Sequence, residues 1–247
     1  MLRGVTFDFW QTLVAEQPGR MRDVRLRMWV EELALAGQAR PIEAIDEAFI
    51  ENWAMFDERW LANTGQWGAV ETVDFVGERL GLRYEDGLRD RLLDTFRIAA
   101  ERADLTVAPN LEACLRTLRD AGLRVGIVCD VGLTAGPVLR DRLETFGLLR
   151  YFDAWSFSDE TGWFKPAPEA FRRALDGMGV EPADAAHVGD LDRTDVAGAL
   201  GLGMIAVQYL GLRDRPPGDS ELVEVEPSTR AHHVLHDHAE LPAALGI

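Results

Sequence analysis

The chain has 247 residues, of which 47% are hydrophobic, and its formal net charge at pH 7 is −16. This length allows one large domain or a domain with a second one inserted, and the hydrophobic content argues against a disordered chain. Nucleic acids and anionic membranes need a basic face, so the negative charge argues against both as main partners.

The cysteine content and the lack of long apolar runs bear on where the protein resides. Cys114 and Cys129 are the only cysteines, too few for a disulfide framework, and they fit a reducing cytoplasm. No apolar run reaches the roughly 18 residues that span a bilayer, and the N-terminal pattern is not that of a signal peptide. We therefore expect a cytoplasmic protein, monomeric or homodimeric.

The first part of the chain changes from a strand-like pattern to a helical one. Residues 2–10 (LRGVTFDFW) predict a short buried strand and a turn. Residues 20–104 contain four stretches with apolar residues at helical spacing, separated by Gly, Pro or Asn, and predict about four helices with no strand among them. Four tryptophans in this segment either form its core or line a pocket: Trp29, Trp53, Trp60 and Trp67. The arginines of residues 20–29 either lie on a solvated helix face or contact an anionic substrate.

The remainder of the chain alternates between two patterns. Helical spacing occurs at residues 110–122, 132–147, 167–179 and 193–203, and strand-like runs occur at 123–130, 152–160, 184–190 and 204–210. This alternation predicts right-handed crossovers and a doubly wound parallel sheet, hence an α/β fold. Residues 212–230 form a polar excursion that contains prolines, and residues 232–247 predict a last short strand and helix.

Charged side chains follow several of the predicted strands. Such sheets bind ligands outside the carboxyl ends of their strands, where Asp8, Cys129, Asp130 and Asp190 are expected, with Lys165, Asp192 and Asp195 in the adjoining loops. Several carboxylates in one cleft repel one another, and a hard divalent cation removes that conflict. Mg²⁺ accepts one or two carboxylates together with waters and phosphate oxygens. The pattern predicts a metal-assisted site with a carboxylate nucleophile and a lysine counter-charge.

Four segments occur in the order of a known set of motifs. "FDFWQTL", "VGIVCD", "KPAPEAF" and "HVGDLDRTD" resemble the four motifs of the haloacid dehalogenase-like hydrolase superfamily, and the resemblance covers the whole chain. It implies a Rossmann-like core formed by residues 1–16 and 106–247. The helical residues 17–105 resemble the all-helical cap that one large subgroup inserts between the first two motifs.

The resemblance also implies catalytic roles. Asp8 would be the nucleophile that forms an aspartyl-enzyme intermediate, and Lys165 would hold Asp8 and the transferring group by its charge. Asp8 and Asp190 would bind Mg²⁺ directly, and Asp195 directly or through water. The backbone carbonyl of Trp10 would complete the protein ligands, which does not depend on the identity of its side chain.

Two residues depart from the family pattern. Phosphatases of the family place at position 10 an Asp that protonates the leaving oxygen, and Trp10 cannot cycle a proton near neutral pH. Cys129 stands where a hydroxyl usually binds the phosphoryl oxygen, and a thiol is a weaker donor. Together with Thr12, in the loop behind Asp8, these two residues are the candidate substrate contacts. Asp130 either caps a helix or turn, or supplies part of the missing acid–base function.

These observations favour a Mg²⁺-dependent phosphatase that acts on a small phosphate ester, with impaired acid–base catalysis. Two alternatives stay open: a metal-independent 2-haloacid dehalogenase, since such enzymes carry an aromatic residue at position 10, and a degenerate relative that only binds a phosphorylated ligand. The acidic last motif favours the phosphatase. We expect His187 to pack or hydrogen-bond. The tail histidines either bind a metal loosely or, as we expect, lie on different sides of a strand and turn: His232, His233, His236 and His238.

Overall fold

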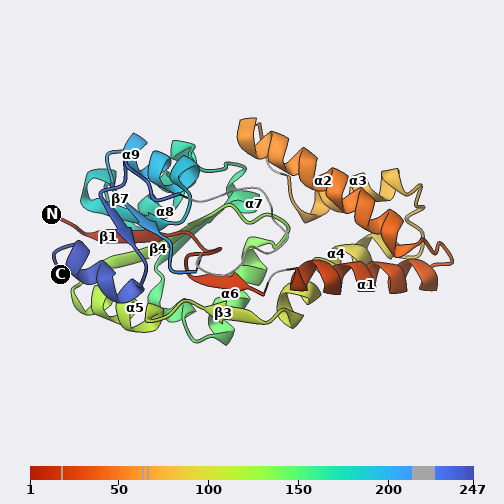
Figure 1. Ribbon diagram of the computed structural model, residues 1–247, viewed down its shortest axis with the longest axis horizontal. Helices are drawn as coiled ribbons and strands as arrows, with labels where there is room; N and C mark the ends of the chain where they lie inside the picture. Colours follow the sequence, from red (N-terminus) through yellow and green to blue (C-terminus); the bar gives the residue numbers. More distant parts are fainter. Residues whose placement is uncertain (18, 63, 66, 213–225) are drawn as a thin grey trace.

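An α/β body and a helical segment form the two ends of the computed structural model (Figure 1). The structure describes residues 1–17, 19–62, 64–65, 67–212 and 226–247. Within these residues no helix is both long and apolar enough to cross a membrane.

The body is built on a six-stranded sheet in which every neighbouring pair of strands is parallel. Its spatial order is β5-β4-β1-β6-β7-β8. The strands are β1 (Gly4–Phe7), β4 (Arg124–Cys129), β5 (Ala154–Phe157), β6 (Ala185–Gly189), β7 (Ile205–Tyr209) and β8 (His233–Leu235). Val5 of β1 lies in register with Val125 and Ala186, so the carboxyl ends of three strands meet at one edge. The predicted doubly wound parallel sheet is confirmed.

Helices cover both faces of this sheet (Figure 1). Their leucines and alanines pack against the alternate residues of the strands and form two buried clusters. One cluster includes α5 (Leu111–Asp120), α6 (Gly136–Thr145) and α10 (Leu241–Ala244), and the other includes α8 (Pro168–Met178) and α9 (Ala197–Gly201). The remaining short helices are α7 (Ser158–Thr161), η1 (Leu149–Tyr151), η2 (Pro182–Asp184) and η4 (His238–Glu240).

The helical segment contains α1 (Arg20–Leu35), α2 (Ile42–Ala62), α3 (Ala69–Arg79) and α4 (Leu88–Arg102). The four predicted helices are confirmed, with no strand among the described residues between α1 and α4. Trp29 is fully buried in the core of the segment, and its Nε1 donates a hydrogen bond to Thr95 Oγ1 at 3.0 Å. Leu133, from the loop that follows β4, belongs to the same buried cluster, so the segment is packed against the body.

Three features differ from the sequence-based expectation or extend it. The chain passes from the body to the helical segment after β2 (Val14–Glu16) and returns to the body at β3 (Leu105–Val107). These two strands pair as an antiparallel ribbon. Strands of three residues are too short to show an alternating pattern, so this ribbon was not predicted. The helix expected at residues 193–203 starts as a π-helical turn, η3 (Asp192–Val196), and continues into α9. Most of the predicted excursion at residues 212–230 lies outside the described residues.

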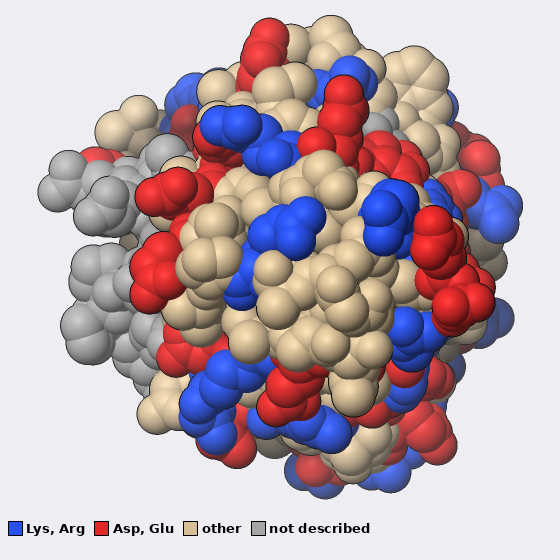
Figure 2. Space-filling view, turned by 90° about the vertical axis from the view of Figure 1, so that its right-hand side faces the viewer, with Lys and Arg blue, Asp and Glu red and all other residues tan. Residues whose placement is uncertain are grey.

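The end of the molecule formed by the helical segment carries interspersed acidic and basic side chains (Figure 2). Arginines of this segment pair with acidic residues: Arg22 with Asp46, Arg79 with Glu51, Arg89 with Asp74, Arg91 with Glu32, and Arg97 with Asp94. Because the positive charges are locally balanced, this face offers no uniform basic surface to a polyanion.

Candidate active site

Three aspartates that follow two different strands meet at the carboxyl edge of the sheet. Asp8 follows β1, Asp190 follows β6, and Asp195 lies on η3. One carboxylate oxygen from each of these residues lies within 4.8 Å of the others, and all three side chains are buried. The sequence predicts that these carboxylates lie at one edge of the sheet, and in the structure their oxygens are close neighbours.

Lys165 is the cation of this cluster. Its Nζ lies 2.6 Å from Asp8 Oδ1 and 2.6 Å from Asp195 Oδ1, and its side chain is only 3% exposed. Burial lowers the pKa of Lys165, but the carboxylates of Asp195 and Asp8 outweigh that effect and raise the pKa well above its usual value. The ammonium group therefore stays charged and holds the two carboxylates together.

The two carboxylates bonded to Lys165 differ in their ionisation. Burial raises the pKa of Asp8 well above its usual value, opposed by Lys165 and reinforced by the charges of Asp195 and Asp190. Burial also acts to raise the pKa of Asp195, but Lys165 and His187 reverse this and lower it. Asp195 thus carries its negative charge stably, whereas ionised Asp8 needs compensation from another positive charge.

Asp195 is fixed by bonds to both of its oxygens. Oδ1 lies 3.0 Å from His187 Nε2, and Oδ2 accepts from the backbone N–H of Leu191 at 3.0 Å. His187 in turn contacts Thr6 Oγ1 through Nδ1 at 2.8 Å, and burial lowers its pKa. A Cβ at Gly189 would overlap the Asp195 carboxyl group, which explains the glycine in the motif. His187 packs and hydrogen-bonds as expected, but its link to Asp195 was not apparent from sequence.

Asp130 lies beside this cluster and connects three elements. Its Oδ1 accepts from the backbone N–H of Lys165 at 3.0 Å, and its Oδ2 accepts from Trp60 Nε1 on α2 at 2.9 Å. Burial raises the pKa of Asp130, and Lys165 opposes the shift. Asp130 does not cap α6, because the N–H of Gly136 at the start of that helix donates to Asp159 Oδ2. The helix-capping role considered for Asp130 is therefore not found at α6, and its role in the turn stays a prediction.

The three candidate substrate contacts differ in accessibility. Trp10 is partly exposed, and its ring packs edge-on against Phe9 at a centroid distance of 4.9 Å. Thr12 is fully buried, and its Oγ1 has no hydrogen-bond partner among the described residues. Cys129 is 1% exposed, and burial and the charge of Asp8 raise its pKa. A thiol that stays neutral is not a nucleophile.

The tail histidines do not assemble into a metal site within the described chain, where the Asp8, Asp190 and Asp195 group is the only such cluster. His232 Nδ1 accepts from the backbone N–H of Ala206 at 3.0 Å. His238 is buried, where it stacks on Tyr209. These histidines serve packing and backbone hydrogen bonding.

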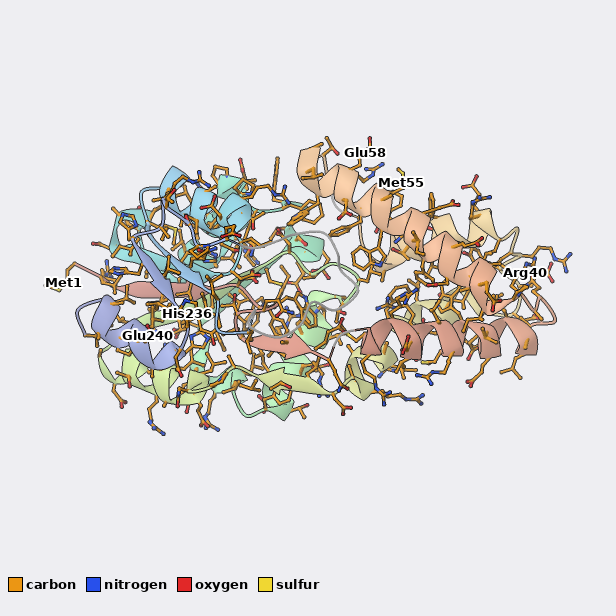
Figure 3. The ribbon with its side chains drawn as sticks, in the orientation of Figure 1. Met1, Arg40, Met55, Glu58, His236 and Glu240 are labelled. Carbon is orange, nitrogen blue, oxygen red and sulfur yellow. The ribbon has the colours of Figure 1, made fainter. Side chains whose placement is uncertain are left out.

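One face of α2 supplies aromatic side chains toward the site. Phe56 packs against Phe164, the neighbour of Lys165, at a ring distance of 5.9 Å, and Trp60 lies under the guanidinium of Arg193 at 3.9 Å. Met55 and Glu58 project from the opposite side of α2, away from the rest of the molecule (Figure 3). The core interpretation holds for Trp29. Trp60 contacts Asp130 and Arg193 beside the carboxylate cluster, and the pocket-lining interpretation stays a prediction. The spacing of three and four residues from Trp53 to Phe56 and Trp60 was the available sequence signal.

Comparison with known proteins gives the same family as the motifs. The family profile described as haloacid dehalogenase-like hydrolase matches residues 2–203. The chain is 36% identical over 139 residues to haloacid dehalogenase-like hydrolase domain-containing protein 3 of Bos taurus, which covers 56% of this chain and 51% of that protein. It is 38% identical over 120 residues to phosphoserine phosphatase of Thermus thermophilus, 47% of this chain and 46% of the enzyme. The chain thus spans about half the length of these two relatives.

A solved structure shares the fold over nearly its full length. The 2-haloacid dehalogenase of Pseudomonas syringae pv. Tomato superposes with a TM-score of 0.70 at 23% identity, covering 100% of this chain and 99% of that one. The parallel sheet, the four motifs at its carboxyl edge and the family profile agree. The chain belongs to the haloacid dehalogenase-like hydrolase family.

Proposed function

We propose that this protein is a Mg²⁺-dependent phosphatase that hydrolyses a small phosphate ester through Asp8. The observation that carries the proposal is the buried Lys165–Asp8 pair, 2.6 Å long, beside two further buried carboxylates. The phosphoserine phosphatase among the relatives supports phosphate esters as the substrate class.

The carboxylate cluster fits a small hard cation. Three oxygens from buried carboxylates lie within 4.8 Å of one another, and carboxylate oxygen is a preferred ligand of Mg²⁺. Asp8 and Asp190 would hold the ion together with the carbonyl of Trp10. Because both oxygens of Asp195 already accept hydrogen bonds, Asp195 would act through water. A bound cation would supply charge that neutralises the phosphoryl oxygens and keeps Asp8 ionised.

The chain's own residues perform the transfer in two steps. A carboxylate oxygen of Asp8 attacks phosphorus while the bond from phosphorus to the ester oxygen breaks, which leaves an aspartyl-phosphate and an alkoxide or phenolate. Water then attacks phosphorus, the acyl-phosphate bond breaks, and Asp8 is regenerated with release of inorganic phosphate. Lys165 balances the negative charge at Asp8 in both steps, and Asp195 with His187 holds Lys165 in place.

Proton transfer to the leaving oxygen is the weak part of this site. Trp10 provides no exchangeable acid, so esters with good leaving groups should react best. Asp130 is the candidate substitute because burial raises its pKa and it lies directly against the Lys165 backbone. Among the carboxylates outside the Asp8, Asp190 and Asp195 cluster, we propose this proton-transfer role only for Asp130.

The helical segment would act as a cap. We propose the division predicted from sequence, with residues 17–105 as cap and residues 1–16 and 106–247 as core. The contacts of Trp60 with Asp130 and of Phe56 with Phe164 support this role, because they bring one helix of the segment against the site. A cap that closes there excludes water and selects the substrate.

The experiment measures phosphate release from 4-nitrophenyl phosphate with Mg²⁺ and with EDTA, together with chloride release from 2-chloropropionate. We expect phosphate release that needs Mg²⁺ and that Asp8→Asn abolishes. Asp192→Asn is the matched control because Asp192 lies in the same motif but pairs with Arg230 outside the cluster. Chloride release in EDTA would establish the dehalogenase instead. Binding of Mg²⁺ with neither product would establish a degenerate relative.

A further inference from the structure

Arg25 differs from the paired arginines of the helical segment. Its side chain is buried, with 6% exposed, and its Nε has no hydrogen-bond partner. Five other arginines of the segment form ion pairs with acidic residues, whereas the Arg25 guanidinium forms none within the parts of the chain that are described. A buried cation whose N–H groups lack hydrogen-bond partners destabilises the fold unless something else is gained by it.

The surroundings of Arg25 keep its guanidinium charged but leave its Nε without a hydrogen-bond partner among the described residues. The guanidinium lies 4.6 Å from the centre of the Phe96 ring and 5.9 Å from that of Phe49. Burial lowers the pKa of Arg25 to about 10, and Glu16 opposes the shift, so the group is a cation at neutral pH. Contacts with aromatic faces compensate part of the lost hydration, but they do not satisfy the N–H groups in the guanidinium plane.

This guanidinium lines a small hollow of about 20 Å³ between two helices. The lining residues are Arg22, Arg25 and Leu26 from α1 and Phe49, Ile50 and Trp53 from α2. Arg22 is already paired with Asp46. The hollow therefore has mainly apolar walls and one positive charge that forms no ion pair with the described residues.

A chain of aromatic contacts links one wall of the hollow to the loop of Lys165. Trp53 packs against Phe56 at 5.2 Å, and Phe56 packs against Phe164, next to Lys165, at 5.9 Å. The N-terminal end of α1 and the C-terminal end of α2 are the ends nearest the sheet (Figure 1). The ring of Trp53 also lies 4.0 Å from where a Cβ at Gly132 would stand, in the loop that carries Asp130, so this wall of the hollow is on the side of the segment that faces the site.

We propose that Arg25 binds a carboxylate of the substrate, so that the natural phosphate ester carries a second, carboxylic acid group. This inference rests on the proposed phosphatase function. A guanidinium and a carboxylate form two parallel hydrogen bonds, and one unpaired cation balances one carboxylate. A second phosphate, with a charge of about −1.5 to −2 at pH 7, would bring more negative charge than Arg25 neutralises.

The test compares 3- and 4-carboxyphenyl phosphate with the corresponding neutral carbamoylphenyl phosphates. Arg25→Met keeps an apolar side chain of similar length, and Arg27→Met removes an exposed charge from the same helix as a control. We expect Arg25→Met to raise KM for a carboxyphenyl ester by roughly ten- to a hundredfold, the range of a lost charged hydrogen bond. KM and kcat for the carbamoyl esters should stay within twofold of the wild-type values.

Two further measurements separate the possible failures. Arg25→Met should melt no lower than wild type, since it removes an unpaired buried charge; a clearly lower Tm, with equal changes in KM for charged and neutral esters, would assign Arg25 a structural role and overturn the proposal. Calorimetric binding of the carboxyphenyl phosphates to Asp8→Asn needs no turnover. If wild type hydrolyses no aryl phosphate, the proposed phosphatase function is wrong. The calorimetric comparison of Asp8→Asn with and without Arg25→Met then still shows whether Arg25 binds a carboxylate.

Discussion

Trp60 Nε1 lies 2.9 Å from Asp130 Oδ2, and this hydrogen bond joins the helical segment to the loop that follows β4. The other oxygen of the same carboxylate accepts from the backbone of Lys165 at 3.0 Å. Asp130 therefore links the position of α2 to the loop that delivers the lysine of the candidate site. Any motion of the segment away from the sheet breaks the first bond and leaves the second intact.

Removal of the Trp60 donor should weaken substrate binding. Trp60→Phe keeps an aromatic ring under Arg193 but loses one hydrogen bond to a charged group, worth about 1.5–3 kcal/mol. We expect KM for 4-nitrophenyl phosphate to rise by roughly ten- to a hundredfold because the segment closes less firmly. Trp67→Phe is the control, since the Trp67 indole bonds to Asn52 within the segment. Equal effects of the two variants would contradict a closing role for Trp60.

Substitution of Asp130 tests its proposed acid–base role. Asp130→Asn should lower kcat by about 10²-fold for alkyl phosphates, where the leaving oxygen needs a proton. The same variant should change kcat little for 4-nitrophenyl phosphate. The measurement is the dependence of kcat on the leaving-group pKa, with Trp60→Phe as a control for the lost contact. Parallel dependences in wild type and Asp130→Asn would remove Asp130 from the mechanism.

A carboxylate at position 10 should restore what the tryptophan lacks. Trp10→Asp adds a general acid two residues from Asp8, the proposed nucleophile, and such groups contribute roughly 10²–10⁴-fold. We expect faster hydrolysis of alkyl phosphates and little gain for activated aryl esters. Trp10→Phe, which adds no acid, controls for the loss of the indole. If both variants accelerate alkyl ester hydrolysis equally, steric relief and not proton transfer is the cause.

Mg²⁺ should stabilise the folded protein independently of turnover. Repulsion among the carboxylates of Asp8, Asp190 and Asp195 falls when a cation binds. At a hundredfold excess over Kd the gain is about 2.7 kcal/mol, which corresponds to a rise in Tm of several degrees. Calorimetric melting with Mg²⁺ and with EDTA measures it. Asp190→Asn should abolish the rise and Asp192→Asn should keep it; a rise that survives Asp190→Asn would place the ion elsewhere.

His238 should make the fold sensitive to mild acid. Burial lowers the pKa of His238 to about 4, and its Nε2 lies 2.9 Å from the backbone carbonyl of Thr12. In the unfolded chain the His238 imidazole has a pKa near 6.5 and is protonated at a pH where the folded chain keeps it neutral. The free energy of unfolding therefore falls as pH drops from about 6.5 toward 4. Between pH 7.5 and 5.0 this loss is about 2 kcal/mol.

Urea unfolding of wild type and His238→Phe at these two pH values measures the contribution. His238→Phe keeps a ring against Tyr209 and should lose about 2 kcal/mol less stability on acidification. His236→Phe, at an exposed position of the same tail, should behave as wild type. The same pH dependence in all three proteins would assign the acid sensitivity to other groups.

Local pattern was sufficient for the body of the protein. Strands such as Arg124–Cys129 and Ala185–Gly189 are apolar runs, and segments with apolar residues at helical spacing separate them. This alternation of strands and helices predicts a parallel sheet. Parallel strands end at the same edge, so the strand order alone predicts that Asp8, Asp190 and the loop of Lys165 lie together. The family profile matches residues 2–203, which contain these motifs.

The sequence by itself determined the parallel sheet, the family and the carboxylates and lysine at its edge, because these depend on period and order along the chain. Only the tertiary structure decided which side chains of the helical segment face the site and which arginine of α1 is buried against aromatic rings. The arginines of α1 repeat around the helix, and packing against Phe49 and Phe96 alone separates buried Arg25 from exposed Arg27. The bonds of Asp130 to Trp60 and of His187 to Asp195 likewise depend on how distant elements pack.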